Sequence, residues 1–164
     1  MYKRQTPVCS EKQLPGFEKN YDKLLSLGIN EVYCISVNDG YVMNAWADQQ
    51  KLTKVKVLPD GNADFTRSMG MLVDKKHVGF GQRSWRYCAI INDGVVEKWW
   101  QEDGMNNDGS DPDPYEQTTP ENCIESNGMG IESTPRQQRL IKRKIARGND
   151  RQNSDKIEFF CVAL

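Results

Sequence analysis

Several features that mark common classes of protein are missing from this chain of 164 residues. There is only one histidine, His77, so a cysteine–histidine hydrolase would have to use it. The five cysteines are odd in number, widely spaced and never in a C-x-x-C pair, which argues against a disulfide scaffold and against a zinc site. No run approaches about 18 apolar residues and no signal peptide is visible, so we expect a cytoplasmic protein without a membrane span.

Charge is balanced overall but unevenly distributed. The net charge of −1 provides no field that would attract nucleic acid. Residues 1–128 hold 14 basic and 19 acidic side chains, whereas residues 129–164 hold 8 basic and 4 acidic ones. The length fits one domain. We therefore predict a folded acidic body over 1–125 and a basic extension over 126–164, either disordered or helical, with 136–147 as its candidate helix.

Alternating short strands and helices are predicted along the body, and the cues for them are local. Gly28 ends the first helix, Asn92-Asp93-Gly94 forms the turn of a hairpin, and Thr119 with Pro120 starts a late helix. The predicted helices are 9–27, 40–52, 63–70 and a short one from 120, the predicted strands are 31–37, 54–58, 85–91 and 95–100, and the predicted loops are 80–84 and 101–117.

Cys9 is the candidate nucleophile of the chain. It follows Thr6-Pro7 and lies at the start of the first predicted helix. Unpaired backbone N–H groups and the positive end of the helix dipole stabilise a thiolate at such a position. A thiolate is the nucleophile of peroxide, disulfide and acyl chemistry. The alternative interpretation of Cys9 is an inert buried cysteine.

Residues 6–17, T-P-V-C-S-E-K-Q-L-P-G-F, resemble the peroxidatic loop of the type II peroxiredoxins, which are coupled to glutaredoxin or thioredoxin. The resemblance continues through 32–39, 58–65 and 81–87 and covers about 6–125. It implies a thioredoxin-like fold, a three-layer α/β/α domain, and a thiol-dependent peroxidase that reduces hydrogen peroxide and alkyl hydroperoxides.

The resemblance also assigns roles to individual side chains. Cys9 would attack the peroxide and become a sulfenic acid. Thr6 would hydrogen-bond the peroxide and the thiolate, although it could instead be a simple turn or cap residue. Arg86 matches the arginine that stabilises the thiolate and the departing oxygen, and Arg83 is the second candidate for that role.

How the sulfenic acid would be reduced is less determined by the sequence. Cys34 matches a cysteine of many type II members and is a possible secondary redox residue, but its apolar strand favours a small core residue. Relatives with an internal resolving cysteine carry it near 114–117, where this chain has none. We therefore expect a one-cysteine cycle with glutathione and glutaredoxin, or thioredoxin, as the external reductant. No metal or organic cofactor is expected. Because members of the family commonly form dimers, the resemblance implies a homodimer.

The chain also departs from the family. Its relatives place strands before the cysteine loop, one of them central to the sheet, and carry a proline where Tyr2 stands. We thus expect an N-terminally incomplete fold with unpaired strand edges. The alternative function is a catalytically impaired remnant that acts as a binding or scaffold protein. The last four residues, 161–164, fit the C-a-a-X pattern, but so short a match predicts no prenylation.

Overall fold

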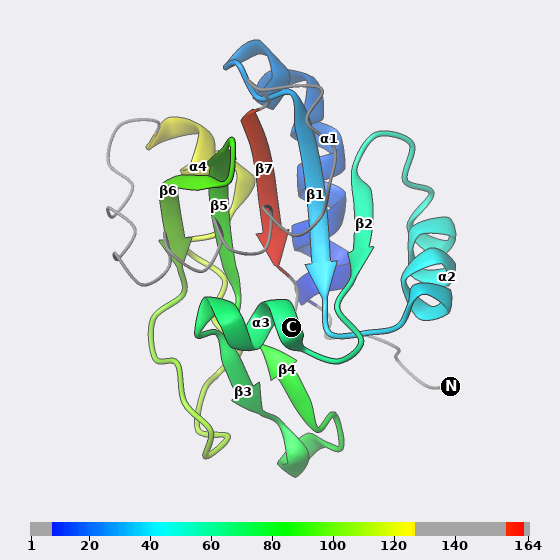
Figure 1. Cartoon of the computed structure of the whole chain (residues 1–164), viewed down its shortest axis with the longest axis vertical. Coiled ribbons are helices and arrows are strands. Elements are labelled where there is room, and N and C mark those ends of the chain that lie inside the picture. The colour runs from blue at the N-terminus through cyan, green and yellow to red at the C-terminus, as the bar shows by residue number, and fades with distance from the viewer. Residues whose placement is uncertain (1–7, 127–156, 163–164) are drawn as a thin grey trace.

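The computed structural model describes residues 8–126 and 157–162, and it has the mixed α/β architecture of the thioredoxin-like fold (Figure 1). In chain order the elements are a π-helical turn η1 (Cys9–Gln13), α1 (Leu14–Ser26), β1 (Glu31–Ser36), α2 (Gly40–Gln50), β2 (Lys56–Pro59), α3 (Asp64–Met69), β3 (Leu72–Asp74), a 3₁₀ turn η2 (Lys76–Val78), β4 (Gln82–Ser84), β5 (Tyr87–Asn92), β6 (Val95–Gln101), α4 (Pro120–Glu125) and β7 (Ile157–Val162).

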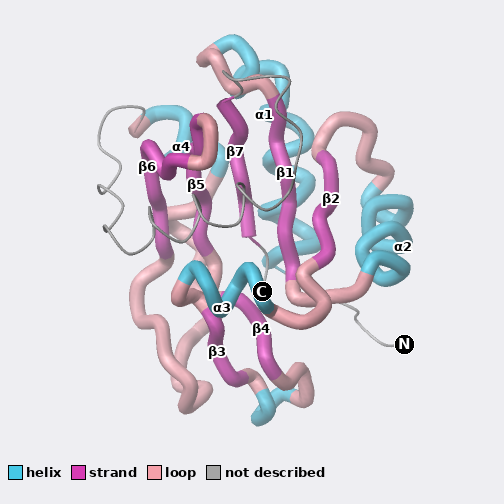
Figure 2. Tube along the Cα trace, in the orientation of Figure 1, coloured by secondary structure: helices cyan, strands magenta, loops and turns pink. Residues whose placement is uncertain are grey.

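A five-stranded sheet with the order β2-β1-β7-β5-β6 forms the middle layer (Figure 2). One core cluster joins a face of this sheet to helices, through Phe17 of α1, Trp46 of α2 and Ile124 of α4. The other cluster covers the opposite face with residues of α3 and of the β3–β4 hairpin, among them Met69 and Val73. The three-layer architecture expected from the sequence is therefore confirmed.

The central strand of the sheet comes from the C-terminal end of the chain. β7 pairs parallel with β1, where Cys161 lies opposite Cys34, and antiparallel with β5, where it lies opposite Cys88. The expectation that residues 126–164 form only a basic extension missed this strand. The expectation of unpaired edges in the middle of the sheet was wrong for the same reason, since β7 occupies that position.

The end of β7 lies beside the start of the helical segment that carries Cys9. The strand ends beside the first helical turn, where Gln13 Nε2 lies 3.4 Å from the carbonyl oxygen of Val162. Because β7 runs parallel to β1, the strand, the helical segment η1–α1 and β1 together have the arrangement of a β-α-β unit. In this unit the first strand is the last described segment of the chain.

Local signals placed most of the other elements well. The Asp39 side chain caps α2 by accepting a hydrogen bond from the Val42 N–H at 2.9 Å, and Asn122 N–H donates to the Thr119 hydroxyl at the start of α4. Asp93 and Gly94 both have positive φ, of 44° and 72°, which matches a two-residue hairpin turn of the I′ type.

Residues 80–84 were expected to be a loop, and that expectation was wrong. Gln82–Ser84 form β4, which pairs antiparallel with β3. Each of these strands has three residues, so neither is long enough to show an alternating pattern. The candidate helix 136–147 lies outside the described residues. Within the described ranges, no helix is long and apolar enough to span a membrane.

Candidate active site

Cys9 begins the π-helical turn that leads into α1. The Leu14 N–H donates to the Cys9 carbonyl, five residues back, which is the hydrogen bond of a π-helix. Pro15 follows directly after this turn, as the second residue of α1, and has no N–H to donate to the preceding turn. Phe17 and Leu24 anchor α1 in the core. Cys9 itself is 0% exposed, so its sulfur lies inside the protein.

Arg86 brings a buried positive charge to the Cys9 sulfur. It lies just before β5 and is 1% exposed, and its Nη2 is 3.5 Å from Cys9 Sγ. Burial disfavours the charged guanidinium, but the neighbouring Cys9 and Asp113 outweigh it and raise the pKa of Arg86. The structure thus brings together two of the three residues expected at the site, and Thr6 lies outside the described residues.

Three consecutive residues of the acidic loop after β6 surround the Arg86 guanidinium. Asp113 Oδ1 accepts from Nη2 at 2.7 Å, and the Pro114 carbonyl accepts from Nη1. The guanidinium carbon lies 5.6 Å from the centre of the Tyr115 ring. Sequence reasoning treated this segment only as a long exposed loop. The acidic composition of the loop could have indicated that it pairs with a basic side chain. Composition does not show which basic side chain each carboxylate contacts.

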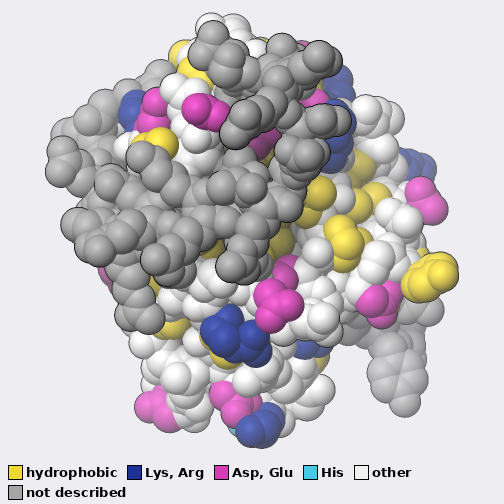
Figure 3. All heavy atoms as spheres, in the orientation of Figure 1, with side chains coloured by type: hydrophobic (Ala, Val, Ile, Leu, Met, Phe, Trp, Pro, Cys, Tyr) yellow, Lys and Arg dark blue, Asp and Glu magenta, His cyan; other side chains and the backbone are white. Residues whose placement is uncertain are grey.

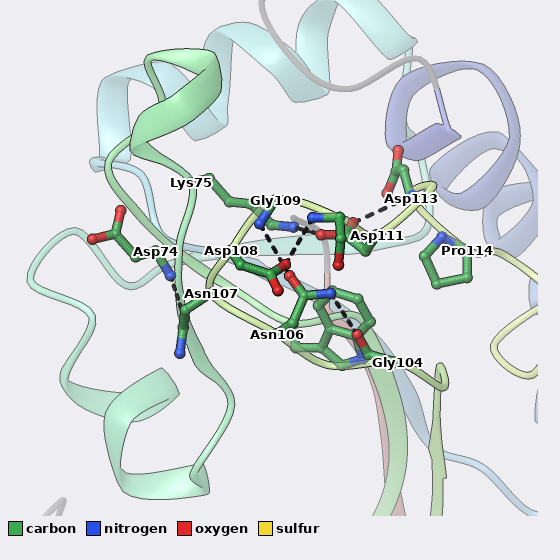
Figure 4. Close-up of polar contacts among 12 residues, drawn as sticks. Asp74, Lys75, Gly104, Asn106, Asn107, Asp108, Gly109, Asp111, Asp113 and Pro114 are labelled. Atoms are coloured by element: carbon green, nitrogen blue, oxygen red, sulfur yellow. Dashed lines mark hydrogen bonds and ion pairs between the residues drawn. The ribbon is translucent and has the colours of Figure 1, made fainter.

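The same loop is fastened to the body at two further points. Asp111 forms an ion pair with Lys75, and both side chains are at most 5% exposed (Figure 4). Glu102 is 1% exposed and accepts hydrogen bonds from the backbone N–H groups of Glu116 and Thr118. Burial opposes ionisation of Glu102, but its hydrogen bonds, first that from the Thr118 hydroxyl, lower its pKa.

Arg83, the second candidate, does not reach Cys9 in the structure. Its Nη1 donates to the Gln82 carbonyl at 2.8 Å, and its guanidinium lies 5.8 Å from the centre of the Phe80 ring. Partial burial lowers the pKa of Arg83. On the surface of α3, Arg67 Nη1 lies 3.2 Å from Asp64 Oδ1. Figure 3 shows basic and acidic side chains next to each other in the region of α3.

Cys34 lies among buried cysteines on the face of the sheet that packs against α1, α2 and α4. Cys34, Cys88 and Cys161 occupy neighbouring positions on β1, β5 and β7, and Cys123 of α4 joins the same cluster. A hydrogen bond with Cys161 and burial raise the pKa of Cys34 well above its ordinary value. Cys34 is thus a protonated core thiol at neutral pH.

The described part of the chain shows neither a disulfide nor a metal site. Cys9, Cys34, Cys88, Cys123 and Cys161 all lie in the described ranges; none of them forms a disulfide, and all are buried. No group of three or more histidine, cysteine, aspartate or glutamate side chains among the described residues is arranged to hold a metal ion. At the site itself, the buried Cys9 thiol lies beside the Arg86 guanidinium.

Comparison with known proteins decides the family. The Redoxin family model matches residues 1–117, which include both Cys9 and Arg86. The chain belongs to the peroxiredoxins. It is 53% identical over 121 residues to Peroxiredoxin y4vD of Sinorhizobium fredii and 44% identical over 102 residues to the chloroplastic Peroxiredoxin-2E of Arabidopsis thaliana. These matches cover 74% and 60% of this chain, and 64% and 44% of the respective relatives. These relatives fit the type II branch of the family that the sequence around Cys9 resembles.

Solved structures agree with this assignment. The 1-Cys peroxiredoxin of Plasmodium falciparum superimposes with a TM-score of 0.71 at 39% identity, and covers 73% of this peroxiredoxin and 70% of its own chain. A reduced Prx3 of Vibrio vulnificus in complex with hydrogen peroxide superimposes with a TM-score of 0.65 at 35% identity, covering 73% and 72%.

Proposed function

We propose that this peroxiredoxin is a thiol-dependent peroxidase that reduces hydrogen peroxide and alkyl hydroperoxides at Cys9. The observation that carries the proposal is the 3.5 Å approach of Arg86 Nη2 to Cys9 Sγ inside the protein. A guanidinium that stays protonated favours the thiolate over the thiol. It also offers a donor to the oxygen that becomes negatively charged as the reaction proceeds.

In the proposed step the Cys9 thiolate attacks the terminal oxygen of the hydroperoxide. The S–O bond forms while the O–O bond breaks, so the sulfur is oxidised to a sulfenic acid and the peroxide is reduced. The departing alkoxide or hydroxide takes up a proton and leaves as an alcohol or water. Arg86 stabilises the charge on that oxygen, and Thr6 is proposed to hydrogen-bond the peroxide.

The reductant is proposed to come from outside the chain. A thiol such as glutathione would attack the Cys9 sulfenic acid and release water, leaving a mixed disulfide that a second thiol then reduces. Glutaredoxin or thioredoxin is the proposed protein partner in this cycle. The raised pKa of Cys34 disfavours it as the attacking thiolate, which supports an external donor. No cofactor is proposed, and two copies are proposed to form a homodimer.

The scaffold alternative loses its main support. It was motivated by a sheet without its central strand, and β7 fills that place with partners on both sides.

A single-turnover experiment tests the proposal. Wild-type protein, reduced and freed of thiol, should consume about one equivalent of peroxide per chain in a rapid burst. Cys9→Ser should abolish the burst, because a serine hydroxyl is not ionised at neutral pH. Cys34→Ser should keep it, because Cys34 lies in the core and contacts Cys161.

A lost burst is informative only if the variant is folded, so the folding of each variant is measured as well. Melting curves by circular dichroism establish that each variant is folded at the assay temperature. A burst of wild-type size in folded Cys9→Ser would remove the proposal, and so would its absence from the wild type. Loss of the burst in folded Cys34→Ser would show that Cys34 takes part in the reaction, and would contradict the assignment of peroxide reduction to Cys9 alone.

A further inference from the structure

Arg86 is nearly inaccessible to water, so neighbouring groups must satisfy its charge and its donors. A guanidinium presents five N–H donors, and a buried one without an anionic partner is strongly destabilising. Nη1 donates to the Pro114 carbonyl, and Nη2 approaches both Cys9 Sγ and Asp113 Oδ1. Within residues 8–126 and 157–162, Nε has no hydrogen-bond partner. Asp113 is the carboxylate that pairs with this cation.

Asp113 is presented to Arg86 by a fastened loop. Its backbone lies in the left-handed region, with φ of 55°, where aspartate is better tolerated than most residues. The Asp113 N–H lies 3.3 Å from Asp111 Oδ1, and Asp111 pairs with Lys75 (Figure 4). The carboxylate is thus tied to the body of the protein through its own backbone.

One nitrogen of Arg86 faces two acidic groups. Nη2 lies 2.7 Å from the Asp113 carboxylate and 3.5 Å from the Cys9 sulfur. Such sharing has two consequences. The carboxylate fixes the direction of the guanidinium through a charge-assisted hydrogen bond. It also places a negative charge near the sulfur, which opposes formation of the thiolate.

We propose that Asp113 is a positioning residue that holds the Arg86 guanidinium toward Cys9 and limits the stabilisation that the guanidinium gives the Cys9 thiolate. The inference rests on the proposed peroxidase function for its kinetic consequence. Its electrostatic consequence does not depend on peroxide and can be measured separately.

Two substitutions separate the two effects. Asp113→Asn keeps an oxygen that can accept from Nη2 but removes the negative charge. The pH midpoint of Cys9 alkylation should therefore fall by about one unit. Asp113→Ala removes the acceptor too, so the guanidinium loses its anchor. The rate constant for the reaction with hydrogen peroxide should then fall about tenfold, because small misplacements of a catalytic group are costly.

A matched control lies on the same loop. Asp108 is exposed, and its side chain accepts from the Ser110 N–H at 2.9 Å. Asp108→Asn removes the same charge five positions away and should leave both readouts at their wild-type values. Glu11 and Lys12, the charged residues of η1 itself, are present in every variant, so their influence on the sulfur cancels in the comparison.

The measurement follows alkylation of Cys9 by iodoacetamide between pH 4 and 9, quantified by mass spectrometry of the Cys9 peptide. An Asp113→Asn midpoint equal to that of wild type and Asp108→Asn overturns the proposal, as does a shift to higher pH. A wild-type peroxide rate in Asp113→Ala also overturns it. A purely structural role would lower the melting temperature without moving the midpoint. If the wild type consumes no peroxide, the peroxidase function fails while the alkylation comparison still tests Asp113.

Discussion

Shortening Phe159 of β7 tests whether the C-terminal strand truly forms the middle of this fold. Phe159 is 0% exposed, and its ring centre lies 5.2 Å from that of Phe17 in α1 and 6.1 Å from that of Trp100 in β6. Replacing such a side chain with alanine costs about 3–5 kcal/mol, through lost burial and the cavity left behind. Because domains of this size are stable by about 5–15 kcal/mol, Phe159→Ala should remove a large share of the stability.

The effect should extend to activity because of where β7 lies. In the sheet, β1 and β5 have no direct pairing, and each pairs with β7. Cys9 belongs to the helical segment that leads to β1, whereas Arg86 immediately precedes β5. Loosening β7 therefore loosens the connection between sulfur and guanidinium. We expect Phe159→Ala to lose peroxide turnover at temperatures where the wild type is fully active.

The neighbouring residue provides the control. Phe160 points to the opposite face of the sheet, is partly exposed, and stacks on Tyr33 with ring centres 5.2 Å apart. Phe160→Ala should cost less than Phe159→Ala, about 2 kcal/mol, because the Phe160 side chain is only partly buried against the second core cluster. Urea titrations followed by circular dichroism measure both variants, with peroxide consumption assayed in parallel. A Phe159→Ala variant no less stable than Phe160→Ala, or wild-type turnover in both variants, would contradict the central role of β7.

Two further predictions concern the anchors of the acidic loop. Since the pKa of Glu102 is lower in the folded protein than its ordinary value of 4.5, its ionisation stabilises the fold above that pH and the contribution is lost as pH falls below it. Melting temperatures from pH 7 to pH 3 should show Glu102→Gln as markedly less stable at pH 7, with the gap to wild type narrowing in acid; a constant gap would contradict this. Lys75→Met should cost about 3–5 kcal/mol, because it leaves the Asp111 carboxylate buried without its cation. Adding Asp111→Leu should recover most of that loss in urea titrations, and a double variant less stable than the single one would count against the ion pair.

Much of this fold is encoded in signals that act over a few residues. Thr119 caps α4, and the positive φ values of Asp93 and Gly94 suit the tight hairpin between β5 and β6. Each of these features depends on neighbours in the sequence, so the sequence alone predicts them. The string around Cys9 likewise indicates the family and makes Cys9 the candidate nucleophile.

What only the tertiary structure decided involves partners that are far apart in the chain. Ile157–Val162 is a short apolar run at the end of a basic segment, and nothing local shows that it pairs with β1 and β5, which lie more than 60 residues away in the chain. Only the packed structure shows that Arg86, and not Arg83, donates to Cys9 Sγ. Asp113 meets the Arg86 guanidinium only because the loop after β6 folds back against it. Pairing of distant strands and burial of opposite charges depend on the whole packed chain, and for that reason local patterns do not reveal them.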